Sequence, residues 1–153
     1  MQIADLLSPD RVSLETGIAS KKRALEHLGE MLAGDDRTPA ASLVFDALSA
    51  REKLGSTGLG HGVAIPHGRM DDIETPRVAL LRLQGGVDFD AIDNEPVDIL
   101  IALIVPVDST SEHLDLLAQL ARALSQPDNI AAIRRASDPA ALHLAASAAF
   151  RDA

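Results

Sequence analysis

The histidine at position 67 follows a short apolar run and precedes a glycine, in the segment 63–68 (VAIPHG). Pro66 fixes its own φ and keeps Ile65 out of the helical region, so the backbone that carries His67 is held stiffly. A neutral imidazole nitrogen is a good nucleophile and forms a high-energy phosphoramidate with a phosphoryl group. A single histidine where a strand meets a loop is usually structural or merely exposed, so its neighbours decide whether it forms a site.

Groups that bind an oxyanion lie near this histidine in the sequence. Arg51, Ser56 and Thr57 can each donate a hydrogen bond to an oxyanion. Glycines make up half of residues 55–62 and let the backbone approach another group closely. Gly68 leaves room for a bulky group next to the ring. A tight loop leading into a strand would explain the same composition equally well.

A second histidine, His113, is expected in the first turn of a helix. Ser109 and Glu112 fit a capping box that starts a helix over residues 109–124. The free N–H groups and dipole of a helix start favour an anion and disfavour a cationic imidazole. A neutral His113 can therefore donate one hydrogen bond to a phosphate, although a surface histidine on an amphipathic helix is the commoner explanation of such a residue.

Several other kinds of site are not supported by the sequence. It contains neither GxxxxGK[ST] nor GxGxxG, which bind nucleotides, and no GxSxG, which marks a hydrolase nucleophile. It has no Cys and no HExxH, and His61 and His67 stand alone without a metal-binding pattern. We therefore expect neither a metal nor a cofactor.

Composition argues against nucleic-acid and membrane partners. The formal net charge is −9, and the chain has no Trp or Tyr and three Phe. An acidic surface repels phosphate backbones and anionic membranes, and without aromatics bases cannot stack on the protein. The acidity favours a basic protein partner, or it only keeps the chain soluble. No apolar run is long enough to span a bilayer and no secretory signal pattern begins the chain, so we expect a cytoplasmic protein without membrane insertion.

Helical and strand-like segments alternate, which indicates an α/β fold, and the length of 153 residues suits a single domain over 1–153. Strands are expected at 63–65, 78–83 and 97–105, and the last of these is apolar enough to be buried on both faces of a sheet.

The expected helices flank these strands. One spans 21–33 and is capped by Ser20, and a second starts at Thr38 and Pro39 and ends near Arg51. The helix over 109–124 is followed by a short helix over 130–135 and by a final helix that Asp138 and Pro139 open. The buried stripe of the helix over 109–124 is expected to comprise Leu114, Leu117, Ala118, Ala121 and Leu124.

The stretch 51–69 (REKLGSTGLGHGVAIPHGR) resembles the active-site region of the fructose–mannitol type enzyme IIA proteins of the bacterial phosphoenolpyruvate-dependent phosphotransferase system. That signature ends in a small apolar run, Pro, the phosphorylated His and a small residue, and here Leu59-Gly60 and, further back, Glu52 precede it. The stretch 89–108 (FDAIDNEPVDILIALIVPVD) is similar to the nitrogen-regulatory branch. The helix bearing His113 falls where the family has its second active-site histidine. The resemblance covers nearly the whole chain.

The resemblance implies a mixed sheet with helices on both faces. It implies that His67 accepts a phosphoryl group, on Nε2, from the phosphohistidine of a small HPr-like carrier, with Arg51 and His113 in support. It also implies that the phosphorylation state regulates other proteins, such as potassium transport or sensor kinase proteins. His61 stands where other members often have Asn or an acidic residue, and its role is open.

Two alternatives remain at this point. The first is a sugar-specific IIA component that relays phosphate to a fructose or mannitol permease. The second is a binding module that regulates a transporter or a sensor kinase in the unphosphorylated form, without any relay.

Overall fold

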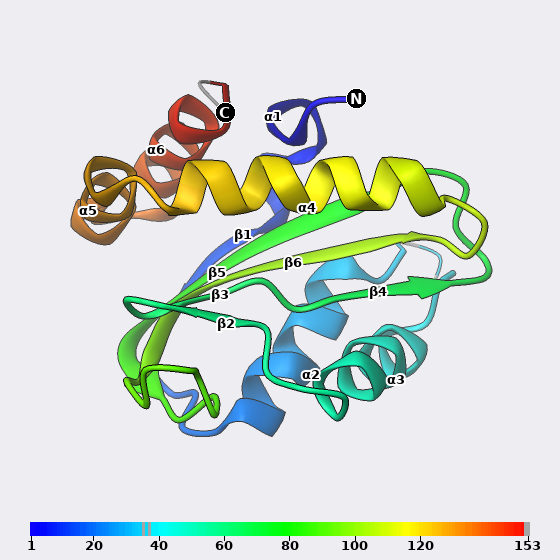
Figure 1. The fold of residues 1–153 in the computed structure, drawn as a ribbon, viewed down its shortest axis with the longest axis horizontal. Coiled ribbons are helices and arrows are strands. Elements are labelled where there is room, and N and C mark those ends of the chain that lie inside the picture. Colours follow the sequence, from blue (N-terminus) through cyan, green and yellow to red (C-terminus); the bar gives the residue numbers. More distant parts are fainter. Residues whose placement is uncertain (35, 37, 152–153) are drawn as a thin grey trace.

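A mixed six-stranded sheet forms the centre of the molecule in the computed structural model, which describes residues 1–34, 36 and 38–151 (Figure 1). The strand order is β1-β5-β6-β3-β2, and β4 also pairs with β6. The strands are β1 (Val12–Glu15), β2 (Gly58–Gly60), β3 (Val63–Ala64), β4 (His67–Met70), β5 (Arg77–Val87) and β6 (Val97–Pro106). The strands β3 and β4 both run parallel to β6, one after the other, and β5 pairs with β6 in the antiparallel sense.

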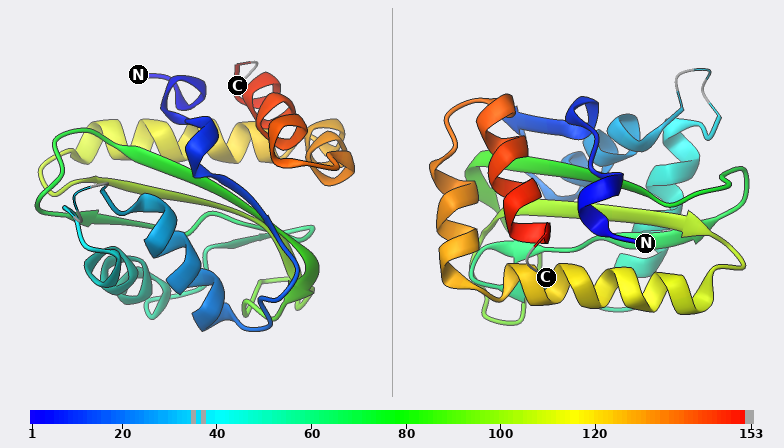
Figure 2. Two further views of the ribbon diagram at one scale, coloured as in Figure 1. Left: turned by 180° about the vertical axis from the view of Figure 1, so that it is seen from behind. Right: turned by 90° about the horizontal axis from the view of Figure 1, so that it is seen from above.

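Helices cover both faces of this sheet, as Figures 1 and 2 show. One face carries α2 (Lys21–Leu32) and α3 (Ala41–Glu52). The other carries α1 (Ile3–Leu6), α4 (Thr110–Leu124), α5 (Pro127–Arg135) and α6 (Pro139–Arg151), and the short 3-10 helix η1 (Pro9–Arg11) precedes β1. The expected α/β architecture, with a mixed sheet between two layers of helices, is confirmed. Within the described residues, no helix is long and apolar enough to cross a membrane.

The strand β6 separates two hydrophobic cores. Its side chains alternate between them, with Ile99, Ile101, Leu103 and Val105 in the core beneath α4, α5 and α6. The intervening side chains enter the core beneath α2 and α3. All residues from 99 to 105 are fully buried, which confirms the prediction of a strand buried on both faces. Each Leu or Ile buried in this way contributes about 1.5–3 kcal/mol to folding, so the strand that borders β4 is firmly fixed.

Of the first two long helices, one begins as predicted and the other does not. The hydroxyl of Ser20 accepts from the N–H of Arg23 (3.1 Å), as expected for α2. The helix α3, however, begins at Ala41 rather than at Pro39, because the N–H of Gly34 donates to the carbonyl of Pro39 (3.1 Å) and holds it in a preceding loop. The expected start at Thr38 and Pro39 is therefore wrong.

The helix α4 begins after Ser109 as expected, but the capping by Ser109 and most of the buried face were predicted wrongly. The side chain of Ser109 makes no capping hydrogen bond. Leu114 is 63% exposed and Ala118 is exposed, whereas the residues buried on α4 are His113, Leu116, Gln119, Leu120, Ala123 and Leu124. Two residues on the buried face are polar, so the pattern of apolar residues does not follow that face. One of them, Gln119, is buried because its amide group binds the N–H of Ile3 (3.0 Å) and the carbonyl of Met1 (2.8 Å).

Candidate active site

His67 is the first residue of β4 and lies opposite Leu103 of β6. Its side chain is buried, and its Nδ1 lies 2.8 Å from the carbonyl oxygen of Ile65. A carbonyl oxygen only accepts, so Nδ1 carries the proton and donates to it. A neutral imidazole has one N–H, and the lone pair of His67 is therefore on Nε2. That nitrogen is the nucleophile of the ring.

The environment of His67 keeps its imidazole neutral. Burial lowers the pKa of His67 below its ordinary value of 6.5, and the hydrogen bond to Ile65 opposes this shift. The positive charge of Arg51 lowers the pKa further, and the carboxylate of Glu52 raises it. Because the net direction is downward, His67 retains its Nε2 lone pair at neutral pH.

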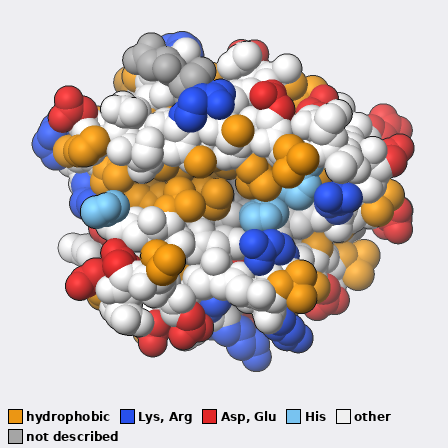
Figure 3. Space-filling view, viewed as in Figure 1, with side chains coloured by type: hydrophobic (Ala, Val, Ile, Leu, Met, Phe, Trp, Pro, Cys, Tyr) orange, Lys and Arg blue, Asp and Glu red, His pale blue; other side chains and the backbone are white. Residues whose placement is uncertain are grey.

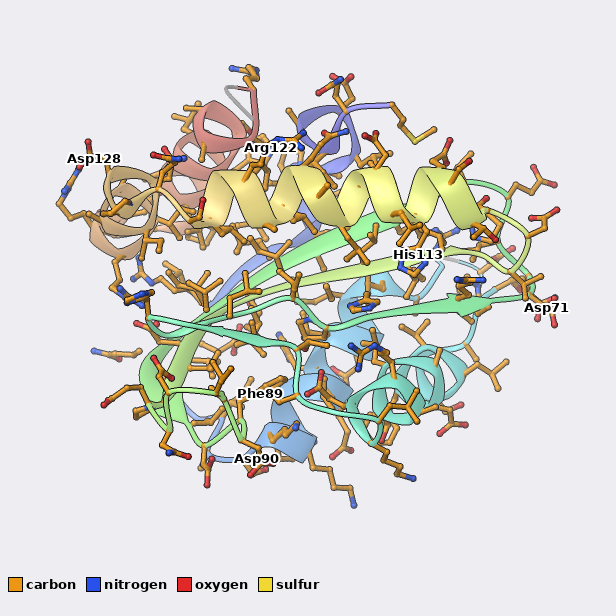
Figure 4. The ribbon with its side chains drawn as sticks, in the orientation of Figure 1. Asp71, Phe89, Asp90, His113, Arg122 and Asp128 are labelled. Carbon is orange, nitrogen blue, oxygen red and sulfur yellow. The ribbon has the colours of Figure 1, made fainter. Side chains whose placement is uncertain are left out.

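His113 meets His67 across the sheet surface. It lies in the first turn of α4, and Figure 4 shows its side chain pointing from that helix toward the strands below. The two rings are arranged edge to face, with centroids 5.3 Å apart. Its Nε2 is buried and is the one buried side-chain nitrogen or oxygen without a hydrogen-bond partner among residues 1–34, 36 and 38–151. Burial, then His67 and Arg69, lower the pKa of His113 to about 4.

Arg69 completes this group, and it was not predicted from the sequence. Its Nε donates to Nδ1 of His113 at 3.3 Å. The signal that would have found it is the strand period, because residues two apart on a strand point to the same face. On β4, His67 and Arg69 therefore share one face. Figure 3 shows histidine side chains next to arginine or lysine side chains on this surface of the molecule, beside a band of hydrophobic side chains.

Arg51 approaches from the opposite layer. It lies in the last turn of α3, and its Nη1 donates to the carbonyl of Gly55 at 2.8 Å. Its charge acts on His67 through the pKa shift described above. The helix and the following loop thus hold a guanidinium group within electrostatic range of the nucleophile.

The hydroxyls of Ser56 and Thr57 both have partners within the protein. Ser56 donates to the carbonyl of Phe89 at 2.8 Å and accepts from the N–H of Gly58 at 3.1 Å. Thr57 donates its hydroxyl to the carboxylate of Glu52, which also accepts from the backbone N–H of Thr57 at 3.1 Å. These contacts hold the loop in place. They do not direct either hydroxyl toward His67, and phosphate binding by these two residues stays a prediction.

Glu52 is a buried carboxylate that connects this loop to α2. Besides Thr57, it pairs with the ammonium group of Lys21, whose Nζ lies 3.0 Å from Oε1. Lys21 also lies over the ring of Phe89, 4.5 Å from its centroid. A buried carboxylate is costly unless it is paired and hydrogen-bonded, and here both conditions are met. The network was not predicted from the sequence, because its members come from four separate segments.

Gly68 faces α3. A Cβ at this position would lie 3.0 Å from the carbonyl oxygen of Ala47 and 3.1 Å from its carbonyl carbon. The space beside Gly68 is therefore filled by the helix, and the missing side chain lets β4 pack closely on α3. Phosphate binding by Gly68 stays a prediction, and only the backbone of Gly68 can make such a contact.

His61 lies apart from this group, in the turn between β2 and β3. It is exposed, with a positive φ of 59°, and its N–H donates to the carboxylate of Asp93 at 2.9 Å. Its carbonyl accepts from Nη2 of Arg134 at 2.8 Å. These contacts give its backbone a structural role in the turn.

Two cavities of the molecule lie away from the site. A cavity of about 340 Å³ is lined by His61, Asp98 and Arg134 among others, and one of about 570 Å³ by Lys21 and Phe45 among others. Neither cavity includes His67 or His113. Among the described residues, no group of three or more His, Asp or Glu side chains could hold a metal ion.

Comparison with known proteins identifies the family. Residues 5–146 match the family described as phosphoenolpyruvate-dependent sugar phosphotransferase system, EIIA 2. The chain is 42% identical to the nitrogen regulatory protein of Pseudomonas aeruginosa over 143 residues, which is 94% of this chain and 93% of that protein. It is 35% identical over 131 residues to the fructose-specific EIIA component of Haloferax volcanii, covering 84% of this chain and 85% of that protein. The crystal structure of the nitrogen regulatory protein IIA-Ntr from Neisseria meningitidis superposes with a TM-score of 0.87 at 38% identity, over 94% of this chain and 98% of that one. The chain therefore belongs to the EIIA 2 family of the phosphoenolpyruvate-dependent sugar phosphotransferase system.

Proposed function

We propose that this protein is a phosphocarrier of the nitrogen-regulatory type, which accepts a phosphoryl group on Nε2 of His67 from the phosphohistidine of an HPr-like carrier. The observation that carries the proposal is the state of His67, a neutral ring whose Nδ1–H is bound by the carbonyl of Ile65 and whose Nε2 holds a lone pair. In the transfer, this lone pair forms a new N–P bond while the bond between phosphorus and the donor's imidazole nitrogen breaks. The electron pair of the broken bond returns to the donor nitrogen, and no metal or nucleotide takes part.

Charge stabilisation is the main task left to the protein, because the donor is already activated. The guanidinium group of Arg51 lies within electrostatic range of His67. The unpartnered Nε2 of His113 is available to a phosphoryl oxygen in a buried setting, where such a bond is strong. We assign Arg51 and His113 as the residues that support transfer, and leave Ser56, Thr57 and the backbone of Gly68 as further candidates.

The position of the site suits a protein donor. His67 lies outside the cavities described above, on a face that also presents histidine, basic and hydrophobic side chains (Figure 3). The chain as a whole carries a net charge of −9. An acidic surface steers a basic carrier toward the site and speeds their encounter. We place this exchange in the cytoplasm, the compartment that the sequence led us to expect.

The regulatory output rests on the relatives. The Pseudomonas and Neisseria proteins are nitrogen regulatory proteins, and they resemble this chain more closely in sequence than the fructose-specific component of Haloferax does. We infer that the phosphorylation state of His67 controls binding to partner proteins, of which potassium transport and sensor kinase proteins are the classes to test first. Relay to a fructose or mannitol permease is the second candidate function, and the Haloferax relative favours it.

The deciding experiment is a phosphorylation assay with phosphoenolpyruvate, the upstream kinase and an HPr-like carrier. Wild-type protein should acquire an acid-labile label, and ³¹P NMR should place it on Nε2 of His67. His67→Ala should take up none, and Arg51→Ala should fold normally and react about 10 to 100 times more slowly. His143→Ala, which removes a half-buried histidine on α6, is the matched control and should label at the wild-type rate. Equal labelling of His67→Ala and wild type would refute the assignment.

A second experiment separates the possible outputs. The wild type, His67→Ala and the mimic His67→Glu are compared in pull-downs with candidate partners. A regulatory switch requires that the mimic bind differently from His67→Ala, and equal binding by all three would exclude it. Transfer of the label to a IIB domain, with phosphorylation of a sugar, would instead establish the permease relay.

A further inference from the structure

We infer that Arg69 is a positioning residue: by donating its Nε–H to Nδ1 of His113, it places the single proton of that ring on Nε2. The inference deepens the proposed function, on which it rests, because Nε2 of His113 is the atom offered to the phosphoryl group. Arg69 itself needs no contact with phosphate to act in this way.

The direction of the hydrogen bond follows from the chemistry of the two groups. Each guanidinium nitrogen carries hydrogen and the group stays charged, so Nε of Arg69 can only donate. The acceptor at 3.3 Å is Nδ1 of His113, which must therefore present a lone pair. A neutral imidazole has one N–H, and in His113 it is left on Nε2. This is the buried nitrogen for which the described residues provide no partner.

The charge of Arg69 supports the same state of the ring. Besides burial and the neighbouring His67, the positive charge of Arg69 lowers the pKa of His113 to about 4. A cationic His113 would carry hydrogen on both nitrogens and could not accept from Arg69. The ring therefore stays neutral at physiological pH and offers one donor.

The two histidines thereby acquire complementary protonation patterns. His67 donates from Nδ1 to the carbonyl of Ile65 and keeps its lone pair on Nε2, where the phosphoryl group attaches. His113 accepts at Nδ1 from Arg69 and keeps its proton on Nε2, where a phosphoryl oxygen needs a donor. With the other tautomer, His113 would present a lone pair to those oxygens and repel them.

The fold brings Arg69, on β4, close to the first turn of α4. Arg69 is aligned with Val105, near the end of β6, and the chain then turns and enters α4, which carries His113 in its first turn. The residue on β4 between His67 and Arg69 is Gly68, which faces α3 instead. One strand thus supplies both the nucleophile and the residue that sets the tautomer of its neighbour.

The test reads the tautomer directly, without reference to activity. The ¹⁵N shifts of the His113 ring distinguish a protonated from an unprotonated nitrogen, and wild type at pH 7 should show hydrogen on Nε2. Arg69→Met, which keeps the length of the side chain but removes the donor, should show a mixture of both tautomers. Arg69→Lys, whose ammonium can only donate, should restore the Nε2–H form. Arg122→Met removes an exposed arginine elsewhere on α4 and should leave the shifts unchanged. An unchanged tautomer in Arg69→Met would overturn the inference.

Kinetics then distinguish positioning from direct contact with phosphate. Arg69→Met should slow phosphoryl transfer about two- to tenfold, because only the fraction of His113 rings that keep hydrogen on Nε2 can donate to the phosphoryl group. In a His113→Ala background the same change should have little further effect, because its route is through His113. A full additional loss there would mean that Arg69 acts on phosphate itself and would refute the positioning role. Absence of labelling in wild type would refute the proposed function instead, and the NMR result would stand separately.

Discussion

The imidazole rings of His67 and His113 meet edge to face, with centroids 5.3 Å apart and ring planes inclined by 70°. They come from β4 and from the first turn of α4, and each ring has one nitrogen fixed by a partner, Ile65 for His67 and Arg69 for His113. The remaining nitrogens are a nucleophile and a donor. In the proposed transfer, this pairing joins the nucleophile and one donor to the phosphoryl group at one place.

Removal of the second histidine should slow transfer without abolishing it. His113→Ala leaves the nucleophile His67 in place and deletes one donor, which is expected to lower the transfer rate about 10- to 100-fold. Rapid-quench measurement of label transfer from the carrier gives the rate, and long incubation should still reach full labelling. His143→Ala is again the control. If His113→Ala reacts at the wild-type rate, His113 is a structural histidine.

The two buried histidines should make stability depend on pH. The pKa of His113 is lowered from 6.5 in the unfolded chain to about 4, and that of His67 is lowered too. Between these pKa values the unfolded chain binds more protons, so the stabilisation is complete above pH 6.5 and is lost as the pH falls toward 4. His113 should account for on the order of 2–3 kcal/mol of the loss.

Urea unfolding between pH 4.5 and 7.5 measures this effect. His113→Gln cannot titrate in that range, so its free energy of unfolding should fall less steeply than that of wild type as the pH drops. Carboxylates titrate in both proteins, and the difference between the two curves isolates the histidine. Parallel curves would show that His113 is not held neutral by the fold.

The sequence predicted those features whose cause is local or periodic. The unbroken apolar run of β6 indicated a strand between two helical layers, and the strand does alternate between two cores. The stripe on α4 was misplaced because Gln119 and His113, both polar, lie on the buried face. Gln119 is buried for its bonds to Met1 and Ile3, more than a hundred residues away, and no periodicity reveals such partners.

In the site, too, the sequence predicted local features but not contacts between distant segments. The motif around His67 lies in one stretch of chain, so the sequence alone predicted a phosphoryl acceptor there, and that assignment stays a prediction. The partners of Ser56 and Thr57 were not, because a hydroxyl beside a glycine loop is equally suited to bind phosphate or protein. Here Ser56 binds Phe89, from a distant segment, and Thr57 binds a carboxylate that is itself buried by the fold. Arg69 was overlooked because the strand expected at 63–65 ended before His67, so residues 67–70 were not recognised as a strand.

Replacement of Gly68 by a larger residue should lower both the free energy of unfolding and the rate of phosphoryl transfer. In Gly68→Ala the new Cβ would meet the backbone carbonyl of Ala47, which cannot rotate away. Forcing β4 off α3 should lower the free energy of unfolding by about 1–3 kcal/mol. Because β4 carries His67, transfer should slow as well. At Gly85 of β5 an added Cβ meets no described atom within 4 Å, so Gly85→Ala is the matched control and should change stability by less than about 1 kcal/mol. Equal stability of the two variants would contradict the close packing at Gly68.

The hydroxyl of Thr57 allows the loop's structural role to be separated from phosphate binding. Thr57→Val keeps the shape of the side chain but removes the donor to Glu52, and we expect the free energy of unfolding to fall by about 1–2 kcal/mol. Because the pairing of Glu52 with Lys21 and with the backbone N–H of Thr57 remains, the loop should keep its course and transfer should stay within about threefold of wild type. Ser42→Ala, which removes an exposed hydroxyl from α3, controls for the loss of a hydroxyl as such. A tenfold slower transfer at unchanged stability would mean instead that the hydroxyl turns from Glu52 to the phosphoryl group, as its place in the glycine-rich loop first suggested.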